Sequence, residues 1–252
     1  GGGRGVFCPW SLLQAGEAGV EVSEYSVRCL VESRYVRTWA RLEVVNAGPA
    51  RRLVPLQLPV PASAFVSNFS VVVGNKTYVS RVRERAQQKA AVHKHSYNDT
   101  GPRLTPASPR GWHVLRASVP VPAGARAVLA ITHEALLQRR LGRYEVALSM
   151  RPGVAARSLR LHVELAESAG ISYVKKTATC KTGQAPEGTA VERSATRARV
   201  RYEPTVQQRR GLSAAERLGE FVVWYDVSRH LGVGDIQVRD GYFVHYFAPT
   251  DL

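Results

Sequence analysis

The chain has 252 residues, of which 44% are hydrophobic and 22% are charged, a composition typical of a folded globular protein rather than a disordered tail. No run of about 18 uncharged apolar residues occurs, which excludes a membrane-spanning helix. The formal net charge of +15 makes polyanions the default class of partner: nucleic acid, glycosaminoglycan or an anionic membrane surface.

Alternation of polar and apolar residues predicts strands through most of the chain. In residues 158–165 four apolar side chains alternate with polar ones, which predicts a strand with one solvent-exposed face. Comparable segments, or segments rich in β-branched and aromatic residues, lie at 26–31, 36–46, 53–58, 65–73, 114–121, 126–132, 144–150, 171–176, 197–202, 221–227 and 242–247. About a dozen strands separated by Pro-rich turns predict an all-β fold, an antiparallel β-sandwich of two packed sheets.

Helix is scarce in this pattern. Good helix formers at 82–92 predict one short helix, and a second turn or two is expected at 213–218. Residues 97–111, with three prolines, and residues 177–193 are predicted to be loops.

The predicted domain organisation has three parts. Residues 1–22 form an N-terminal extension without stable order, 23–230 form the β-sandwich domain, and 231–252 form a C-terminal strand and linker. Because the chain begins with three glycines and no methionine, we interpret it as a fragment.

The search for catalytic or metal chemistry is negative. The sequence has no nucleophile-elbow, phosphate-loop, zinc-protease or dinucleotide-binding motif, so we expect no enzyme, catalytic residue or cofactor. His93 and His95 lack a third ligand and are interpreted as solvated loop residues. Cys8, Cys29 and Cys180 have no zinc-ligand spacing and allow at most one internal disulfide, and Cys29 is interpreted as a small hydrophobic residue in a strand.

Asparagine is more informative. Three of the four asparagines begin an Asn-x-Ser/Thr glycosylation triplet, namely Asn68, Asn75 and Asn98. This frequency favours a secreted glycoprotein. We expect Asn98, in a Pro-rich loop, to be modified more readily than Asn68, which borders an apolar run.

Two basic clusters supply the remaining chemical signal. Arg197, Arg199 and Arg201 share one face of a predicted strand, and Arg81, Arg83 and Arg85 share a face if their segment is extended. A row of guanidinium groups suits the sulfates and carboxylates of a glycosaminoglycan and equally suits nucleic-acid phosphates. The alternative is that the arginines record only a bias in composition.

The C-terminal segment GDIQVRDGYFVHYFAP at 234–249 resembles the signature that precedes the von Willebrand type A domain in inter-alpha-trypsin inhibitor heavy chains. Three further segments resemble the N-terminal VIT domain of that family, in the same order: AFVSNFS at 64–70, EALLQRRLGRYE at 134–145 and EFVVWYDV at 220–227. Residues 136–144 and 167–171 are most similar to the heavy chain 5 branch.

The resemblance implies a secreted, glycosylated, β-rich protein of the extracellular matrix. It implies association with hyaluronan and, for a full-length protein, a possible protease-inhibitor light chain as partner. The chain stops at Leu252, where relatives enter the type A domain with its metal site, so no metal site is expected here. Asp251 lacks the context of the aspartate that relatives esterify to hyaluronan, and no such role is assigned to it.

Two hypotheses follow. In the first, the chain is a non-enzymatic extracellular matrix interaction module that binds hyaluronan or another glycosaminoglycan. In the second, it is a basic intracellular protein that binds nucleic acid, which agrees with the charge but not with the three glycosylation triplets.

Overall fold

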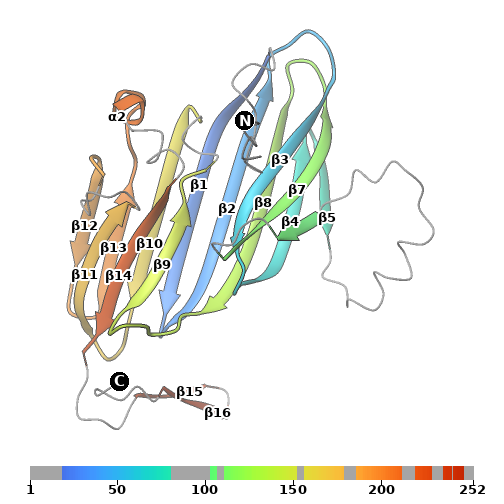
Figure 1. Cartoon of the computed structure of the whole chain (residues 1–252). Helices are drawn as coiled ribbons and strands as arrows, with labels where there is room; N and C mark the ends of the chain where they lie inside the picture. The colour runs from blue at the N-terminus through green and yellow to red at the C-terminus, as the bar shows by residue number, and fades with distance from the viewer. Residues whose placement is uncertain are drawn as a thin grey trace, which may run out of the picture. The chain divides into compact units, whose positions relative to one another are not determined.

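The computed structural model describes residues 19–80, 103–106, 111–151, 156–178, 186–211, 219–228, 235–239 and 241–246. These residues form β-strands and one short helix (Figure 1), which confirms the all-β prediction. Within this described part of the chain, no helix is long and apolar enough to cross a membrane.

The strands are β1 (Val20–Glu32), β2 (Tyr35–Asn46), β3 (Arg52–Pro61), β4 (Phe65–Val73), β5 (Lys76–Ser80), β6 (Arg103–Pro106), β7 (Trp112–Val121), β8 (Arg126–Leu136), β9 (Tyr144–Ser149), β10 (Ser158–Ala166), β11 (Ile171–Ala178), β12 (Thr189–Arg193), β13 (Arg197–Tyr202), β14 (Glu220–Val227), β15 (Asp235–Arg239) and β16 (Tyr242–Tyr246). The helix is α2 (Val206–Gly211).

These strands form one large sheet and three small ones. The eight-stranded sheet has the order β12-β13-β10-β1-β2-β8-β4-β5. Two three-stranded sheets have the orders β11-β14-β9 and β3-β7-β6, and β15 pairs with β16 as a hairpin.

Contacts divide the chain into two compact units. Unit 1 comprises Gly1–Ser26, Trp39–His133 and Arg151–Leu159, and unit 2 comprises Val27–Thr38, Glu134–Met150 and Arg160–Leu252. The sheet β3-β7-β6 belongs to unit 1, whereas β11-β14-β9 belongs to unit 2. The sequence predicted one second sheet for the whole chain, and instead each unit has a three-stranded sheet of its own.

The core of unit 1 follows from alternation within its strands. Inward-facing residues of β3 are buried and pair with buried residues of β7, as in Val54 opposite Val119 and Leu56 opposite Ala117. The larger sheet contributes Phe69 and other buried side chains from β2, β4 and β8. Burial of these apolar surfaces drives the two sheets of the unit together.

Two stacked aromatic pairs lie in the core of unit 2, one between its sheets and one across neighbouring strands of the sheet β11-β14-β9. Tyr202 of β13 stacks on Phe221 of β14 with ring centroids 5.3 Å apart, and Tyr144 of β9 stacks on Tyr225 of β14 at 5.2 Å. All four rings are almost fully buried. Aromatic pairs of this kind stabilise a core by about 0.5–1.5 kcal/mol beyond the area that they bury.

Four observed strands were not predicted from the sequence: β5, β6, β12 and β15. The loops predicted at 97–111 and 177–193 are wrong in part, because β6 lies in the first and the end of β11 and β12 lie in the second. Strands β5, β6 and β12 lie at sheet edges, and no residue of β12 is buried, so the apolar alternation that reveals an inner strand is absent. The predicted helices at 82–92 and 213–218 lie outside the described residues, and α2 begins earlier, at Val206.

Cys29 lies in β1 and is fully buried as a free thiol. Burial raises the pKa of the Cys29 thiol to about 12, so this residue is an unreactive part of the core. The interpretation of Cys29 as a small hydrophobic residue is confirmed. Cys8 and Cys180 lie outside the described residues.

A buried carboxylate fastens the turn between β1 and β2. The two turn residues, Ser33 and Arg34, both have positive φ angles, of 47° and 69°. The backbone N–H of Arg34 donates to Oε1 of Glu167 at 3.1 Å, and the hydroxyl of Tyr225 donates to the same oxygen at 2.7 Å. Burial and the Glu167 carboxylate raise the pKa of Tyr225 well above its usual range, so its hydroxyl remains a donor.

We predict that Glu167→Ala destabilises the chain by about 2–3 kcal/mol, because a buried hydroxyl and a buried N–H lose their acceptor. Urea unfolding of both proteins measures this difference. Tyr225→Phe is the matched control, because it removes only one of the two donors and should cost less. Equal stability of Glu167→Ala and the unmodified chain would contradict the assigned role.

We further predict an acid-sensitive stability due to His133, which is buried in β8. Burial lowers the pKa of His133 to about 4, from 6.5 in an unfolded chain. The unfolded chain binds more protons between these values, so His133 lowers the free energy of unfolding as pH falls from about 6.5 to about 4, by up to about 1.4 kcal/mol per pH unit. Urea unfolding at pH 7 and pH 5 should show a smaller loss for His133→Phe, and an identical loss would disprove this origin.

Candidate functional site

The predicted arginine row lies on the exposed face of β13. Ala198, Val200 and Tyr202 are buried, whereas the alternating residues Arg197 and Arg199 are exposed and Arg201 is half-exposed. The apolar half of the strand packs into unit 2, so the guanidinium groups are directed to solvent. This placement follows directly from the period of two residues in a strand.

Carboxylates from both neighbouring strands accompany the row. Glu164 of β10 and Glu192 of β12 each lie opposite Arg199 in the sheet register. Arg199 forms ion pairs with Glu164 at 3.8 Å and with Glu192 at 3.6 Å, and Arg201 also pairs with Glu192. Charges therefore alternate across the strands rather than forming an uninterrupted cationic surface.

Arg28 of β1 extends this pattern, because it pairs with Glu164 at 3.4 Å. We use the name arginine face for Arg28, Glu164, Glu192, Arg197, Arg199 and Arg201. Within the described part of the chain, no carboxylate forms an ion pair with Arg197, in contrast to the other three arginines of this face. Four arginines against two glutamates leave the face with an excess of positive charge.

The ion pairs of the arginine face are exposed and exchangeable. The side chains of Arg199, Arg201 and Glu192 are 40–56% exposed. Pairs at this exposure contribute about 0–1 kcal/mol each, so an external anion can replace a glutamate at little cost. A guanidinium group also has five N–H donors, and one carboxylate leaves several of them available.

The second predicted set, Arg81, Arg83 and Arg85, lies outside the described residues, as do His93 and His95. Within the described ranges, no group of three His, Cys, Asp or Glu residues is arranged to hold a metal ion.

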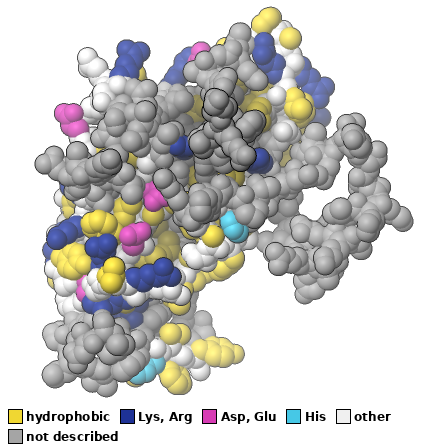
Figure 2. Space-filling view, in the orientation of Figure 1, with side chains coloured by type: hydrophobic (Ala, Val, Ile, Leu, Met, Phe, Trp, Pro, Cys, Tyr) yellow, Lys and Arg dark blue, Asp and Glu magenta, His cyan; other side chains and the backbone are white. Residues whose placement is uncertain are grey.

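Sequence reasoning missed a cation–aromatic cluster on the outer side of the sheet β11-β14-β9. The guanidinium of Arg143 lies 4.0 Å from the ring centroid of Trp224, and Trp224 Nε1 donates to Glu145 at 2.8 Å. Lys175 lies opposite Trp224 in the register with β11. Figure 2 shows basic and hydrophobic side chains together over the lower ends of these strands.

A tight turn stands beside this cluster. Arg140 and Arg143 exchange backbone hydrogen bonds of 2.9 and 3.1 Å around Leu141 and Gly142, which both have positive φ angles. Leu141 is 94% exposed in a conformation that costs a non-glycine residue about 1–2 kcal/mol. Residues 134–145 were singled out in the sequence by their resemblance to the VIT domain. The residues around this segment did not indicate that Trp224, far away in the sequence, would lie next to it.

The structure separates the asparagines into two kinds. Asn75 is exposed in the turn between β4 and β5, and Asn68 is exposed on the outer side of β4. Asn46, which has no glycosylation triplet, is fully buried, and its Nδ2 donates to the carbonyl oxygens of Ala50 and Val121. Asn98 lies outside the described residues.

Comparison with known proteins adds a family model and several relatives. Residues 22–133 match the model described as Vault protein inter-alpha-trypsin domain. The chain is 32% identical to inter-alpha-trypsin inhibitor heavy chain H4 of Bos taurus, over 96% of this chain and 27% of that protein. It is 33% identical to heavy chain H6 of Homo sapiens, over 92% of this chain and 18% of that protein.

The chain therefore spans about a quarter or less of the length of these relatives. Similarity to heavy chain 5 in particular stays a prediction. Among solved structures, the chain is similar to a putative nutrient binding protein from Legionella pneumophila, with a TM-score of 0.52 at 9% identity, over 81% of this chain and 67% of that one. At this identity the likeness concerns the fold alone.

Proposed function

The chain belongs to the inter-alpha-trypsin inhibitor heavy chain family, and from that membership we propose that it is a non-enzymatic, secreted glycoprotein module that binds acidic glycans such as hyaluronan in the extracellular matrix. The observation that carries the glycan part of the proposal is the arginine face. Three of its four guanidinium groups stand on one strand, β13, and those of Arg199 and Arg201 form exposed, weak ion pairs with glutamates.

The geometry of β13 suits a polymer of repeated charges. Alternate residues of a strand are about 6.6–6.8 Å apart, so three arginines can contact successive anionic groups without bending the protein. A polymer replaces several glutamate partners in one binding event, whereas a small anion replaces one. Contacts at this exposure are screened beyond about 8 Å in physiological salt, so the affinity falls as salt rises.

We expect replacement of Arg197, Arg199 and Arg201 by Ala to lower the salt concentration at which the protein elutes from immobilised heparin and to weaken its retention on immobilised hyaluronan. The matched control is the replacement of Arg52, Arg126 and Arg157 by Ala. It removes the same charge and, like the test set, includes two arginines that form ion pairs, here with Glu43 and Glu21. Equal elution of the two triple variants would refute the assignment to the arginine face.

The proposed competition between glutamates and glycan predicts that Glu192→Gln strengthens binding to heparin. This change removes the carboxylate shared by Arg199 and Arg201 and leaves the arginines in place, so elution should require more salt. Elution at lower salt would show that Glu192 orients the arginines rather than competing with the glycan.

The exposure of Asn75 supports the glycoprotein part of the proposal. We expect peptide mapping of the protein secreted from animal cells to show glycan at Asn75 and Asn98. Thr77→Val should abolish the modification at Asn75 while leaving the asparagine in place, because Thr77 completes its triplet. An unmodified Asn75 peptide from the secreted protein would be the contrary result. Retention of the native protein in the nucleus would instead favour nucleic acid as the partner.

A further inference from the structure

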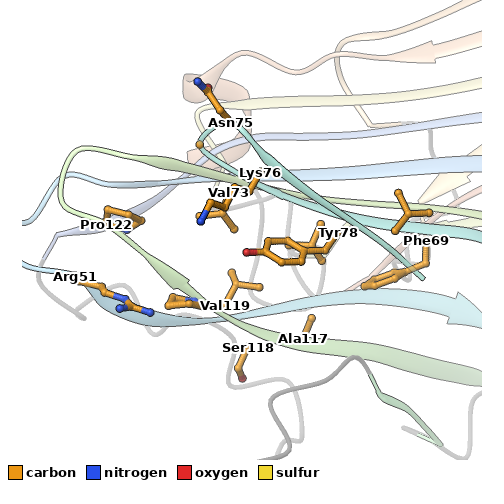
Figure 3. A pocket seen from close by; sticks show the side chains of 14 residues that line it. Arg51, Phe69, Val73, Asn75, Lys76, Tyr78, Ala117, Ser118, Val119 and Pro122 are labelled. Atoms are coloured by element: carbon orange, nitrogen blue, oxygen red, sulfur yellow. The ribbon is translucent and has the colours of Figure 1, made fainter. Parts of the chain in front are cut away.

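A second candidate site is a cavity of about 950 Å³ inside unit 1 (Figure 3). Residues of β4, β5 and β7 line it, so it lies in the space between the two sheets of that unit. This volume is near the upper end of the range of about 300–1,000 Å³ found for small-molecule sites.

The register of β4 and β5 shows why the space is open. Tyr78 lies opposite Val71, and Lys76 lies opposite Val73, so both β5 residues belong to the inner face of the hairpin. Phe69 and Val71 on that face are buried, whereas Tyr78 is 58% exposed. An inward-facing aromatic side chain on the last strand of the sheet thus lacks the cover that its neighbours have.

The cavity has one apolar end and one cationic end. Figure 3 shows Phe69 at one end and Arg51 and Lys76 at the other, with the hydroxyl of Tyr78 directed toward the cationic end. Val71 and Val119 add apolar surface to the lining. Among the described residues, the lining contains two cations and no carboxylate.

We infer that this cavity binds a monomeric medium-chain fatty acid. The carboxylate accepts charge-assisted hydrogen bonds from Arg51, Lys76 and the hydroxyl of Tyr78, and the hydrocarbon tail packs against Phe69, Val71 and Val119. Each methylene group removed from water adds about 0.8 kcal/mol to binding, so tail length raises the affinity. This site is separate from the arginine face, which belongs to unit 2.

The test is calorimetric titration of the 252-residue chain with dodecanoate, with dodecanol and with acetate. We expect dodecanoate to bind at micromolar concentrations, dodecanol to bind more weakly and acetate not to bind. The variant Arg51→Glu with Lys76→Glu should weaken dodecanoate binding about tenfold or more and leave dodecanol binding within about twofold. The matched control, Arg140→Glu with Arg210→Glu, makes the same charge change at exposed residues of unit 2 that lie outside the arginine face, and it should leave both ligands unaffected.

A second measurement places the ligand. A fatty acid with a nitroxide near the end of its tail should broaden the methyl resonances of Val71 and Val119, but not those of Val163 and Val200 in unit 2. Absence of dodecanoate binding, equal weakening by the control pair, or broadening confined to unit 2 would each overturn the inference.

Discussion

Glu167 is the single buried group on which much of unit 2 depends. Its carboxylate accepts hydrogen bonds from the turn that joins β1 to β2 and from Tyr225 in β14. The Ser33 N–H also donates to the Ala166 carbonyl at the end of β10, so the turn is fastened to that strand by backbone and side chain alike. Because β1, β10 and β14 meet at this group, the carboxylate fixes the strands that support the arginine face and the outer cluster around Trp224.

A net charge of +15 does not make this surface uniformly cationic. On the arginine face, Glu164 and Glu192 stand between the arginines and share their donors. Such pairs contribute little to stability, but they set a threshold for binding, since an external anion must replace a partner already in place. A polymer with regularly spaced charges meets this requirement better than an isolated anion does.

Both candidate sites include residues of edge strands, and these edge strands were not predicted from the sequence. Glu192, which modulates the arginine face, lies on β12, and Tyr78 and Lys76, which line the cavity, lie on β5. Both strands end the eight-stranded sheet and leave most of their side chains exposed. An edge strand has one hydrogen-bonded neighbour and little apolar burial, so it lacks the alternation that makes an inner strand recognisable and has side chains free to meet a ligand.

The sequence by itself determined the all-β class, the inner strands and the direction of Arg197, Arg199 and Arg201, because a strand turns alternate residues to opposite faces whatever surrounds it. For β4 and β13 the predicted and observed bounds agree, at 65–73 and 197–202. Only the tertiary structure decided which carboxylates stand beside those arginines, that Trp224 lies under Arg143, and that Arg51 shares a cavity with Lys76 and Tyr78. Each of these contacts joins separate segments of the chain through sheet pairing or packing, and the alternation within one segment does not specify which other strand becomes its neighbour.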